Sequence, residues 1–320
     1  VPMAAIYLTE DDVRELLDVE TAIEAVEGAF RALAEEKAVN VPRTRARSPG
    51  ITLHVMSAAA EYLGFVGWKA YTTTRAKARF HIGLSAIASG ELVALIEADF
   101  LGQLRTGAAS GVATQYMARP DAKTVGLFGS GKQARTQLKA MTAVRRIERA
   151  EVYSRNADRR HQFAREMSEY CGTQVVPVHS PEEAAAEKDI VICATTSEVP
   201  LFEGRMLEPG THLNVVGSNY LAKAEIDVET VRRSDSIVCD SIEACRREAG
   251  DFVEALEAGV TDWPLMHELA DVVAGRETGR ALPEQITLFK SVGLAIEDVA
   301  LAVKLLERAH DEKVGQRLPF

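Results

Sequence analysis

The chain has 320 residues, and 37 Lys and Arg against 47 Asp and Glu give it a formal charge of −10. Without an excess of positive charge it is poorly suited to neutralising phosphates, so we expect no nucleic-acid partner and no anionic membrane surface. The hydrophobic content of 47% and the charged content of 26% are typical of a globular protein. At roughly 150 residues per domain, this length predicts about two domains.

The sequence contains no run of about 18 apolar residues that would predict a membrane helix. Val1–Glu10 lacks the basic start and apolar run of a secretory signal, so we expect a cytoplasmic protein. The cysteines form no CxxC pair and have no histidine at metal-binding spacing. We therefore expect no metal site and four buried thiols, those of Cys171, Cys193, Cys239 and Cys245.

The first hundred residues predict two helices followed by a sheet. Between Asp11 and Lys37 apolar residues recur at helical spacing, with a break near Leu17 and with Asp18 or Thr21 able to cap the second helix. From residue 41 to 98 the pattern changes to short alternating runs separated by polar turns, which predicts a mainly antiparallel sheet. The expected strands are Thr44–Arg47, Ile51–Met56, Gly64–Thr73, Phe80–Ala88 and Leu92–Glu97.

A helix is expected from Leu101 to Ala118, where Arg119-Pro120-Asp121 ends it. Strands and helices then alternate, which predicts parallel strands joined by crossover helices. The strands expected are Thr124–Phe128, Ala150–Tyr153, Val175–Val178, Ile190–Ala194, His212–Val216 and Ser236–Cys239, and the helices are Gln133–Val144, Ala157–Tyr170 and Pro181–Lys188. A last apolar helix, Gly293–Ala309, could pack back onto the first domain.

A glycine-rich motif follows the apolar strand Thr124–Phe128 and reads Gly129-Ser130-Gly131-Lys132-Gln133-Ala134. Gly129 permits a tight turn, Gly131 allows the backbone to approach a pyrophosphate, and Ala134 allows close packing of the helix on the strand. The helix then offers its N-terminal N–H groups to phosphate. In this strand, loop and helix context the motif predicts a Rossmann-type dinucleotide-binding domain; a merely structural turn is the alternative.

The second strand of this domain ends in Ser154-Arg155-Asn156, where a binder of NAD normally has an acidic residue. Ser154 and Asn156 can bind a 2′-phosphate while Arg155 supplies charge, which favours NADP(H), with NAD(H) possible. Alternatively, Arg155 is a solvated surface residue and Asp158 reaches the ribose. Further along the domain, Thr195 and Thr196 end the fourth strand where loops line a cofactor cleft, although they could simply cap that loop.

Lys69 lies in the apolar strand Gly67-Trp68-Lys69-Ala70-Tyr71, on the face opposite Trp68. It is either an edge lysine with its amine in water or a desolvated lysine whose pKa is low enough to exchange a proton with an amine or imine.

Other basic residues of the first domain could bind a carboxylate. Arg43, Arg45 and Arg47 project from one strand face and could clamp an acid group or form a charged edge. Arg105 is expected at the positive end of a helix of small residues, a favourable place for a carboxylate or phosphate. For His54 the pattern leaves open a packed strand residue or a proton carrier.

Several segments together resemble the ornithine cyclodeaminase and μ-crystallin family, in the family's order and over nearly the whole chain. They are Pro42-Arg43-Thr44, Gly67–Tyr71, Leu104–Ser110, Gly129–Ala134, Leu207–Asn219 and Leu288–Asp298. The resemblance implies an α/β enzyme with a Rossmann-type, doubly wound parallel sheet and an α+β dimerisation and substrate domain. It implies a homodimer, and a dinucleotide-binding domain of residues 119–293 inserted between residues 1–118 and 294–320.

The resemblance also implies roles for individual residues. Lys69 would lie beside the substrate nitrogen, and Arg43 and Arg105 would bind the substrate carboxylate, with Arg43 preferred over Arg45 because it matches the family's motif. The motifs place Asn219 at the substrate. The cofactor-binding residues expected beyond the glycine loop and second strand are Thr106, Thr195, Thr196, Gly217, Ser218, Ser291 and Gly293.

Two departures from the family's pattern bear on the reaction. Cyclodeaminases have an Asp at the position of Asn219, which cannot ionise and so cannot act as a general base. His54 replaces an acidic residue and becomes a candidate second proton carrier. With the NADP preference, these differences favour reduction of a cyclic imino acid, Δ1-pyrroline-2-carboxylate or Δ1-piperideine-2-carboxylate. Alternatives are an alanine-type amino acid dehydrogenase, an ornithine cyclodeaminase, or a μ-crystallin-like ligand-binding protein.

Overall fold

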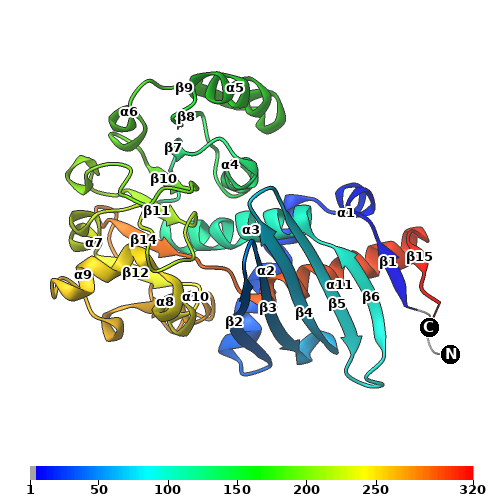
Figure 1. Ribbon diagram of the computed structural model, residues 1–320. Helices are drawn as coiled ribbons and strands as arrows, with labels where there is room; N and C mark the ends of the chain where they lie inside the picture. The colour runs from blue at the N-terminus through cyan, green and yellow to red at the C-terminus, as the bar shows by residue number, and fades with distance from the viewer. Residues whose placement is uncertain (1–4, 320) are drawn as a thin grey trace. The chain divides into compact units, whose positions relative to one another are not determined.

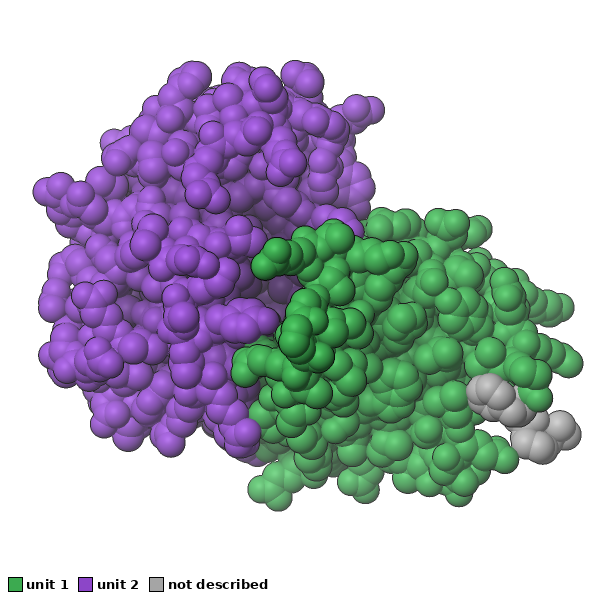
Figure 2. Space-filling model, viewed as in Figure 1, with its two compact units in different colours: residues 1–105, 294–320 green, residues 106–293 purple. Residues whose placement is uncertain are grey.

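The computed structural model describes residues 5–319; residues 1–4 and 320, including part of the segment examined for a secretory signal, lie outside the described residues. The chain forms two compact units, one of residues 1–105 and 294–320 and the other of residues 106–293, coloured separately in Figure 2. The division falls inside one long helix, whereas the sequence favoured a boundary after that helix. None of the helices described is both long and apolar enough to cross a membrane.

Unit 1 combines a mainly antiparallel sheet with helices (Figure 1). Among its described residues the strand order is β15-β1-β6-β5-β4-β3-β2, and the β1–β6 pair is parallel. The elements are β1 (Ile6–Leu8), α1 (Glu10–Leu16), α2 (Val19–Ala34), β2 (Ala38–Ser48), β3 (Ile51–Ala60), β4 (Phe65–Thr74), β5 (Ala78–Ala86), β6 (Leu92–Glu97), α11 (Ala295–Glu312) and β15 (Gln316–Arg317), together with the start of α3 (Asp99–Met117).

Local signals explain the helical pair at the start of unit 1. Thr9 and Asp12 form a reciprocal capping box on α1, and the Asp18 side chain accepts a hydrogen bond from the N–H of Thr21 at the start of α2. The helical pair, its break near Leu17 and the cap at Asp18 are therefore confirmed. Helix α11 packs against β2, β3, β4 and β5 and against α2, so it covers one face of the sheet.

Unit 2 contains a parallel sheet with the order β13-β12-β14-β11-β10-β7-β8-β9 among its described residues. The elements are β7 (Thr124–Phe128), α4 (Lys132–Val144), β8 (Arg149–Tyr153), α5 (Ala157–Cys171), β9 (Gln174–Pro177), α6 (Pro181–Ala185), β10 (Ile190–Cys193), β11 (His212–Val215), α7 (Val228–Arg233), β12 (Ser236–Cys239), α8 (Ile242–Glu248), α9 (Val253–Glu257), β13 (His267–Glu268), α10 (Leu269–Val273) and β14 (Thr287–Lys290). Short 3-10 helices are Glu61–Leu63 in unit 1, and Gly204–Met206, Gly250–Phe252 and Trp263–Leu265 in unit 2.

The topology of unit 2 confirms the expected doubly wound α/β fold. From β7 the chain runs outward through β8 to β9 and then returns to the other side of β7 at β10. Because such crossovers are right-handed, this reversal creates a switch point at the carboxyl ends of β7 and β10, where α/β proteins bind ligands. Strand β14, which the alternating pattern did not predict, inserts between β11 and β12.

Candidate active site

Lys69 is a buried residue of a central strand. Strand β4 lies between β3 and β5, and Lys69 pairs with Met56 on one side and Ile82 on the other. Only 3% of the residue is exposed, and its ammonium lies 5.5 Å from the centre of the Phe80 ring. The alternative of an edge lysine in water is therefore wrong.

Two acidic residues at the start of α11 contact two basic side chains of unit 1, Lys69 and Arg105. Nζ of Lys69 lies 2.7 Å from Oδ1 of Asp298, and the same oxygen accepts a 3.1 Å hydrogen bond from Nε of Arg105. Nη1 of Arg105 donates to Oε2 of Glu297 at 2.8 Å. Glu297 and Asp298 are fully buried. These four side chains, two cations and two carboxylates, are called the Lys69 cluster below.

Sequence reasoning assigned no role to Glu297 or Asp298. The available signal was a pair of acids inside the apolar run from Leu294 to Leu301, because buried acids are rare unless they are paired. The position expected for Arg105 is wrong. Helix α3 begins at Asp99, so Arg105 lies in its second turn rather than at the positive end, and its partners are carboxylates of α11.

The electrostatics of the cluster differ for its two cations. Burial lowers the pKa of Lys69 to about 8; the Asp298 carboxylate opposes this shift, whereas Arg105 and Arg43 add to it. Burial also disfavours the charged form of Arg105, but Asp298 and Glu297 raise its pKa above the ordinary value, so it stays charged. Of the two cations, Lys69 is therefore the one that can exchange a proton near neutral pH.

His54 lies on the same face of the sheet as Lys69. Its ring stacks on Tyr71 at 4.2 Å, and Nε2 is 3.0 Å from Oγ1 of Thr73. Arg45 pairs with His54 across β2 and β3, and Arg43 and Arg45 are half-buried while Arg47 is exposed. Burial, followed by the charges of Arg45, Arg43 and Arg47, lowers the pKa of His54 to about 4. The imidazole is thus neutral near neutral pH.

The glycine loop of unit 2 has the geometry of a phosphate cradle. Gly129 has a φ of +111°, which L side chains rarely adopt, and apart from Gly131 and its chain neighbours no atom of the described residues lies within 4 Å of the place where a Cβ on Gly131 would stand. Helix α4 starts at Lys132, and its N-cap residue, Gly131, has no side chain to bond the first N–H groups of the helix. Ala134 is fully buried on α4. Space and a helix N-terminus therefore suit a dinucleotide pyrophosphate.

The loop after β8 is tied to the glycine loop. Oγ of Ser130 donates to Oγ of Ser154 at 3.0 Å, and the Asn156 side chain caps α5 by accepting from the N–H of Arg159 at 2.9 Å. Arg155 and Arg159 are exposed, whereas Arg160 is buried and donates to the carbonyl of Ser154 at 2.6 Å. Three arginine side chains thus lie in or just after the loop that follows β8.

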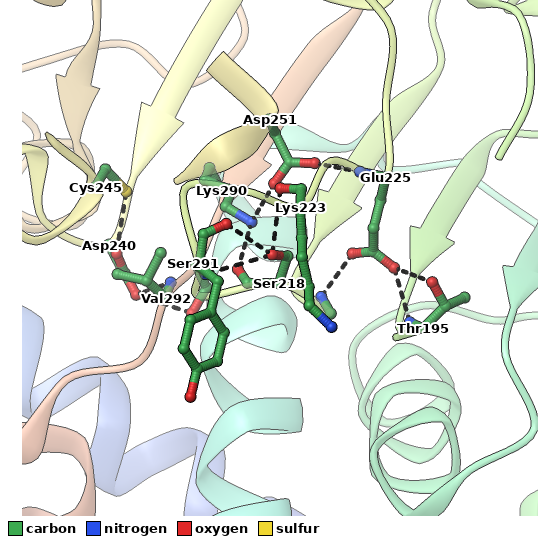
Figure 3. A network of polar contacts seen from close by, with 12 residues as sticks. Thr195, Ser218, Lys223, Glu225, Asp240, Cys245, Asp251, Lys290, Ser291 and Val292 are labelled. Carbon is green, nitrogen blue, oxygen red and sulfur yellow. Dashed lines mark hydrogen bonds and ion pairs between the residues drawn. The ribbon is translucent and has the colours of Figure 1, made fainter. Parts of the chain in front are cut away.

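The remaining cofactor candidates are on the carboxyl ends of neighbouring strands. Thr195 and Thr196 follow β10, Gly217, Ser218 and Asn219 follow β11, and Ser291 and Gly293 follow β14. Several of their donors are engaged by buried carboxylates within unit 2, as Figure 3 shows. Thr106 is a buried residue of α3, whose carbonyl accepts from Nε2 of Gln137 at 3.0 Å. Lys132 is exposed and Gln133 half-buried at the start of α4.

The cysteines are free thiols. Cys193, Cys239 and Cys245 are buried as expected, but Cys171 is partly exposed because it is the last residue of α5. Across residues 5–319 no three His, Cys, Asp or Glu side chains are grouped so that they could hold a metal ion.

Comparison with known proteins adds a family to this geometry. The model of the ornithine cyclodeaminase/mu-crystallin family matches residues 3–313. A Delta(1)-pyrroline-2-carboxylate reductase of Bacillus cereus is 31% identical over 328 residues, which cover 98% of this chain and 100% of the relative. The structure of the Thermococcus litoralis Delta(1)-pyrroline-2-carboxylate reductase in complex with NADH and L-proline is 38% identical with a TM-score of 0.93, covering 98% of this chain and 100% of that one.

A second type of enzyme is also similar. An archaeal alanine dehydrogenase dimer with bound NAD is 31% identical, with a TM-score of 0.91 and coverage of 99% of this chain and 100% of that one. The family model spans nearly the whole sequence, and the relatives are covered from end to end. The resemblance identified from the motifs is confirmed, and the chain belongs to the ornithine cyclodeaminase/mu-crystallin family.

Proposed function

We propose that this protein reduces a cyclic imino acid, Δ1-pyrroline-2-carboxylate or Δ1-piperideine-2-carboxylate, with NADPH. As in its named relatives, the activity is that of an oxidoreductase acting on a carbon–nitrogen bond. The observation that carries the proposal is the buried Lys69 amine, whose pKa is lowered to about 8 and which is held by Asp298 at 2.7 Å. An acid with this pKa is largely protonated at neutral pH and releases its proton readily.

The charges of unit 1 suit a substrate with one carboxylate. Within the Lys69 cluster, the two cations are balanced by Glu297 and Asp298. Arg43 also acts on this region, because its positive charge lowers the pKa of both Lys69 and His54. We assign the substrate carboxylate to Arg43 and Arg105, whose guanidinium groups can bind it through charge-assisted hydrogen bonds.

In the proposed reaction, Lys69 donates a proton to the imine nitrogen, which makes the adjacent carbon electrophilic. The nicotinamide supplies the hydride to that carbon when NADPH is bound. Asp298 orients the Lys69 amine and favours its protonated form, because the negative charge of Asp298 opposes the effect of burial on the Lys69 pKa. His54, neutral and stacked on Tyr71, would take part as a hydrogen-bonding group rather than as a charged acid.

Unit 2 would hold the cofactor through Gly129, Gly131 and the N-terminus of α4 at the pyrophosphate. The preference for NADPH over NADH rests on Ser154 and on the exposed Arg155 and Arg159. Solved relatives are bound to NADH or NAD, so this preference belongs to our proposal for this chain rather than to the family.

Three alternatives use the same residues differently. The archaeal alanine dehydrogenase neighbour favours a dehydrogenase acting on an open-chain oxo acid and ammonia, for which turnover would depend on ammonia. Cyclodeamination is disfavoured because Asn219 cannot ionise. A ligand-binding protein would bind a cyclic imino acid in the presence of NADPH without consuming either compound.

We further propose that the chain forms a homodimer through the sheet face opposite α11. Alternation along β2, β3 and β4 places a set of apolar side chains on this face, each between 37% and 58% exposed, and a large exposed apolar surface is typical of an interface. The alanine dehydrogenase neighbour is a dimer. The apolar residues are Val39, Val41, Ile51, Leu53, Val55 and Val66.

Purified protein should oxidise NADPH when given Δ1-pyrroline-2-carboxylate, in a reaction that does not require ammonia. Lys69→Met keeps the apolar stem of the side chain and removes the proton, so it should lower kcat by about 100-fold or more while NADPH still binds. No NADPH oxidation with either cyclic imino acid would contradict the proposed function. Ammonia-dependent turnover of an oxo acid would establish the dehydrogenase instead.

A further inference from the structure

Glu225 is a fully buried carboxylate between β11 and α7 that no motif singled out. Oε1 accepts hydrogen bonds from the N–H and Oγ1 of Thr195, each at 2.7 Å (Figure 3). Oε2 accepts from the N–H of Gly217 at 2.7 Å. Thr195 follows β10 and Gly217 follows β11. One carboxylate therefore joins the loops at the carboxyl ends of two adjacent strands.

A buried ion pair holds Glu225 in place. The Glu225 N–H donates to Oδ1 of Asp251 at 2.6 Å, and Oδ2 of Asp251 lies 2.6 Å from Nζ of Lys290, with both side chains fully buried. Lys290 is the last residue of β14 and also donates to the carbonyl of Ser218 at 2.9 Å. The loops after β11 and β14 are thus linked through the same group of side chains.

The charges of this group depend on one another. Burial raises the pKa of Glu225 and the nearby Asp251 adds to the rise, while Lys290 opposes it. Burial would lower the pKa of Lys290, but Asp251 and Glu225 raise it, so the ammonium stays charged. Within this group the Lys290 ammonium therefore serves both carboxylates, and loss of its charge would leave both of them uncompensated.

The fit around Gly217 shows how closely these loops approach. A Cβ at Gly217 would stand 2.4 Å from Oε1 of Glu225 and 2.5 Å from the N of Thr195. Any side chain at this position would displace the carboxylate from its donors. Gly217 is therefore required by the contact with Glu225, which differs from the direct cofactor contact that the sequence predicted for it.

Asp240 performs a parallel task beside β14. It follows β12, the neighbour of β14, and its Oδ2 accepts hydrogen bonds from Oγ of Ser291 at 2.8 Å, from the N–H of Val292 at 2.8 Å and from the N–H of Gly293 at 2.7 Å. The loops after β10, β11 and β14 carry most of the remaining cofactor candidates. Hydrogen bonds to buried carboxylates thus fix all three loops (Figure 3).

We infer that Glu225, fixed by Asp251 and Lys290, is a positioning residue that sets the conformation in which the loops after β10 and β11 bind the dinucleotide. This inference rests on the proposed function for the existence of a dinucleotide site. The N–H groups of Thr195 and Gly217 donate to Glu225 and so are not available to the cofactor. Other groups of the same loops would contact the cofactor.

Glu225→Gln tests the inference because a side-chain amide has only one oxygen acceptor. Whichever way the amide turns, its NH2 group faces the N–H of either Thr195 or Gly217, so one loop loses its anchor. Asp189→Asn is the matched control. Asp189 lies just before the amino end of the same strand, β10, whereas Thr195 follows its carboxyl end. Its Oδ2 accepts hydrogen bonds from the N–H groups of Lys123 and Thr124 at 2.8 and 2.9 Å.

Both variants should melt at a lower temperature than the wild type. Only Glu225→Gln should weaken NADPH binding, measured by fluorescence titration, by roughly 10- to 100-fold, the loss expected for a hydrogen bond to a charged group. In the protein without nucleotide, hydrogen exchange at Thr195 and Gly217 should also be faster in Glu225→Gln and unchanged in Asp189→Asn. At saturating NADPH, the KM for the imino acid should stay near the wild-type value.

Wild-type NADPH affinity in Glu225→Gln, or equal loss of affinity in Asp189→Asn, would overturn the inference. A wild-type protein that binds no dinucleotide would overturn both the inference and the proposed cofactor. A wild-type protein that binds NADPH but reduces no cyclic imino acid would contradict the proposed substrate alone, and the ratio of the two variants' affinities would still decide the role of Glu225.

Discussion

Lys69 and Asp298 are 229 positions apart in the sequence, yet Nζ of the lysine lies 2.7 Å from Oδ1 of the aspartate, and both side chains are buried. The contact exists because α11 packs on the sheet face that carries Lys69. Burying an amine favours its neutral form, whereas an adjacent carboxylate favours the charged form. The balance between these effects places the pKa of Lys69 at about 8.

Removing the Asp298 charge should shift the pH profile of the reaction. If protonated Lys69 is the acid, wild-type kcat/KM falls as the pH rises through about 8. Asp298 raises the Lys69 pKa, so Asp298→Asn lowers it, and activity should be lost at a pH about one to three units below that of the wild type. The measurement is kcat/KM for Δ1-pyrroline-2-carboxylate across neutral and alkaline pH.

Glu297→Gln is the control for this shift. It removes a carboxylate of the same cluster that accepts a hydrogen bond from Arg105, whereas the charge that raises the Lys69 pKa most is that of Asp298. The alkaline limb should therefore stay close to that of the wild type. Equal shifts in the two variants would mean that total buried charge, rather than the Lys69–Asp298 contact, sets the profile.

His54 should titrate far below neutral pH. Burial and the charges of Arg45, Arg43 and Arg47 lower its pKa to about 4, so its imidazole resonances in an NMR titration should show a midpoint near that pH. His54→Phe keeps a ring to stack on Tyr71 and should leave the shape of the kcat/KM profile unchanged between mildly acidic and neutral pH. An acidic limb near pH 6.5, the ordinary His value, that disappears in this variant would contradict the neutral assignment.

The sequence predicted the features that local pattern determines. The strand and helix around Gly129–Ala134 follow from alternation and glycine spacing, and the apolar neighbours of Lys69 marked it as a candidate for desolvation. The doubly wound sheet followed from alternating strand and helix patterns. These signals lie within a few residues of one another, so no tertiary contact is needed to recognise them.

The parts that escaped prediction depend on contacts between distant segments. Asp298 reaches Lys69 only because α11 returns to the first sheet, and Glu225 reaches Thr195 only because β10 and β11 are neighbours. Arg105 was expected at the positive end of a helix, but α3 starts at Asp99, which puts Arg105 in its second turn. The sequence pattern also did not predict strand β14, Thr287–Lys290.

Reversing the charge of Arg155 should reduce the preference for NADPH. Arg155 is exposed at the carboxyl end of β8, where a 2′-phosphate is expected. Arg155→Asp should raise the KM for NADPH by roughly 10-fold or more, as expected for loss of a charge-assisted contact, and change that for NADH little. Arg165→Asp makes the same charge change on an exposed residue further along α5 and should leave both values near wild type. Equal loss for NADPH and NADH would rule out a contact with the 2′-phosphate.

A charge on the apolar sheet face should dissociate the proposed dimer. Leu53 is 40% exposed near the start of β3, on the face opposite α11, so Leu53→Glu would place a carboxylate in the proposed interface without entering the core of unit 1. Burying an unpaired charge is costly, and sedimentation equilibrium should therefore show monomers. Leu265→Glu is the control, because Leu265 is 68% exposed in unit 2 and should tolerate the change as a dimer. A Leu53→Glu protein that remains dimeric would show that the two copies associate through another surface, and a wild-type monomer would exclude the dimer itself.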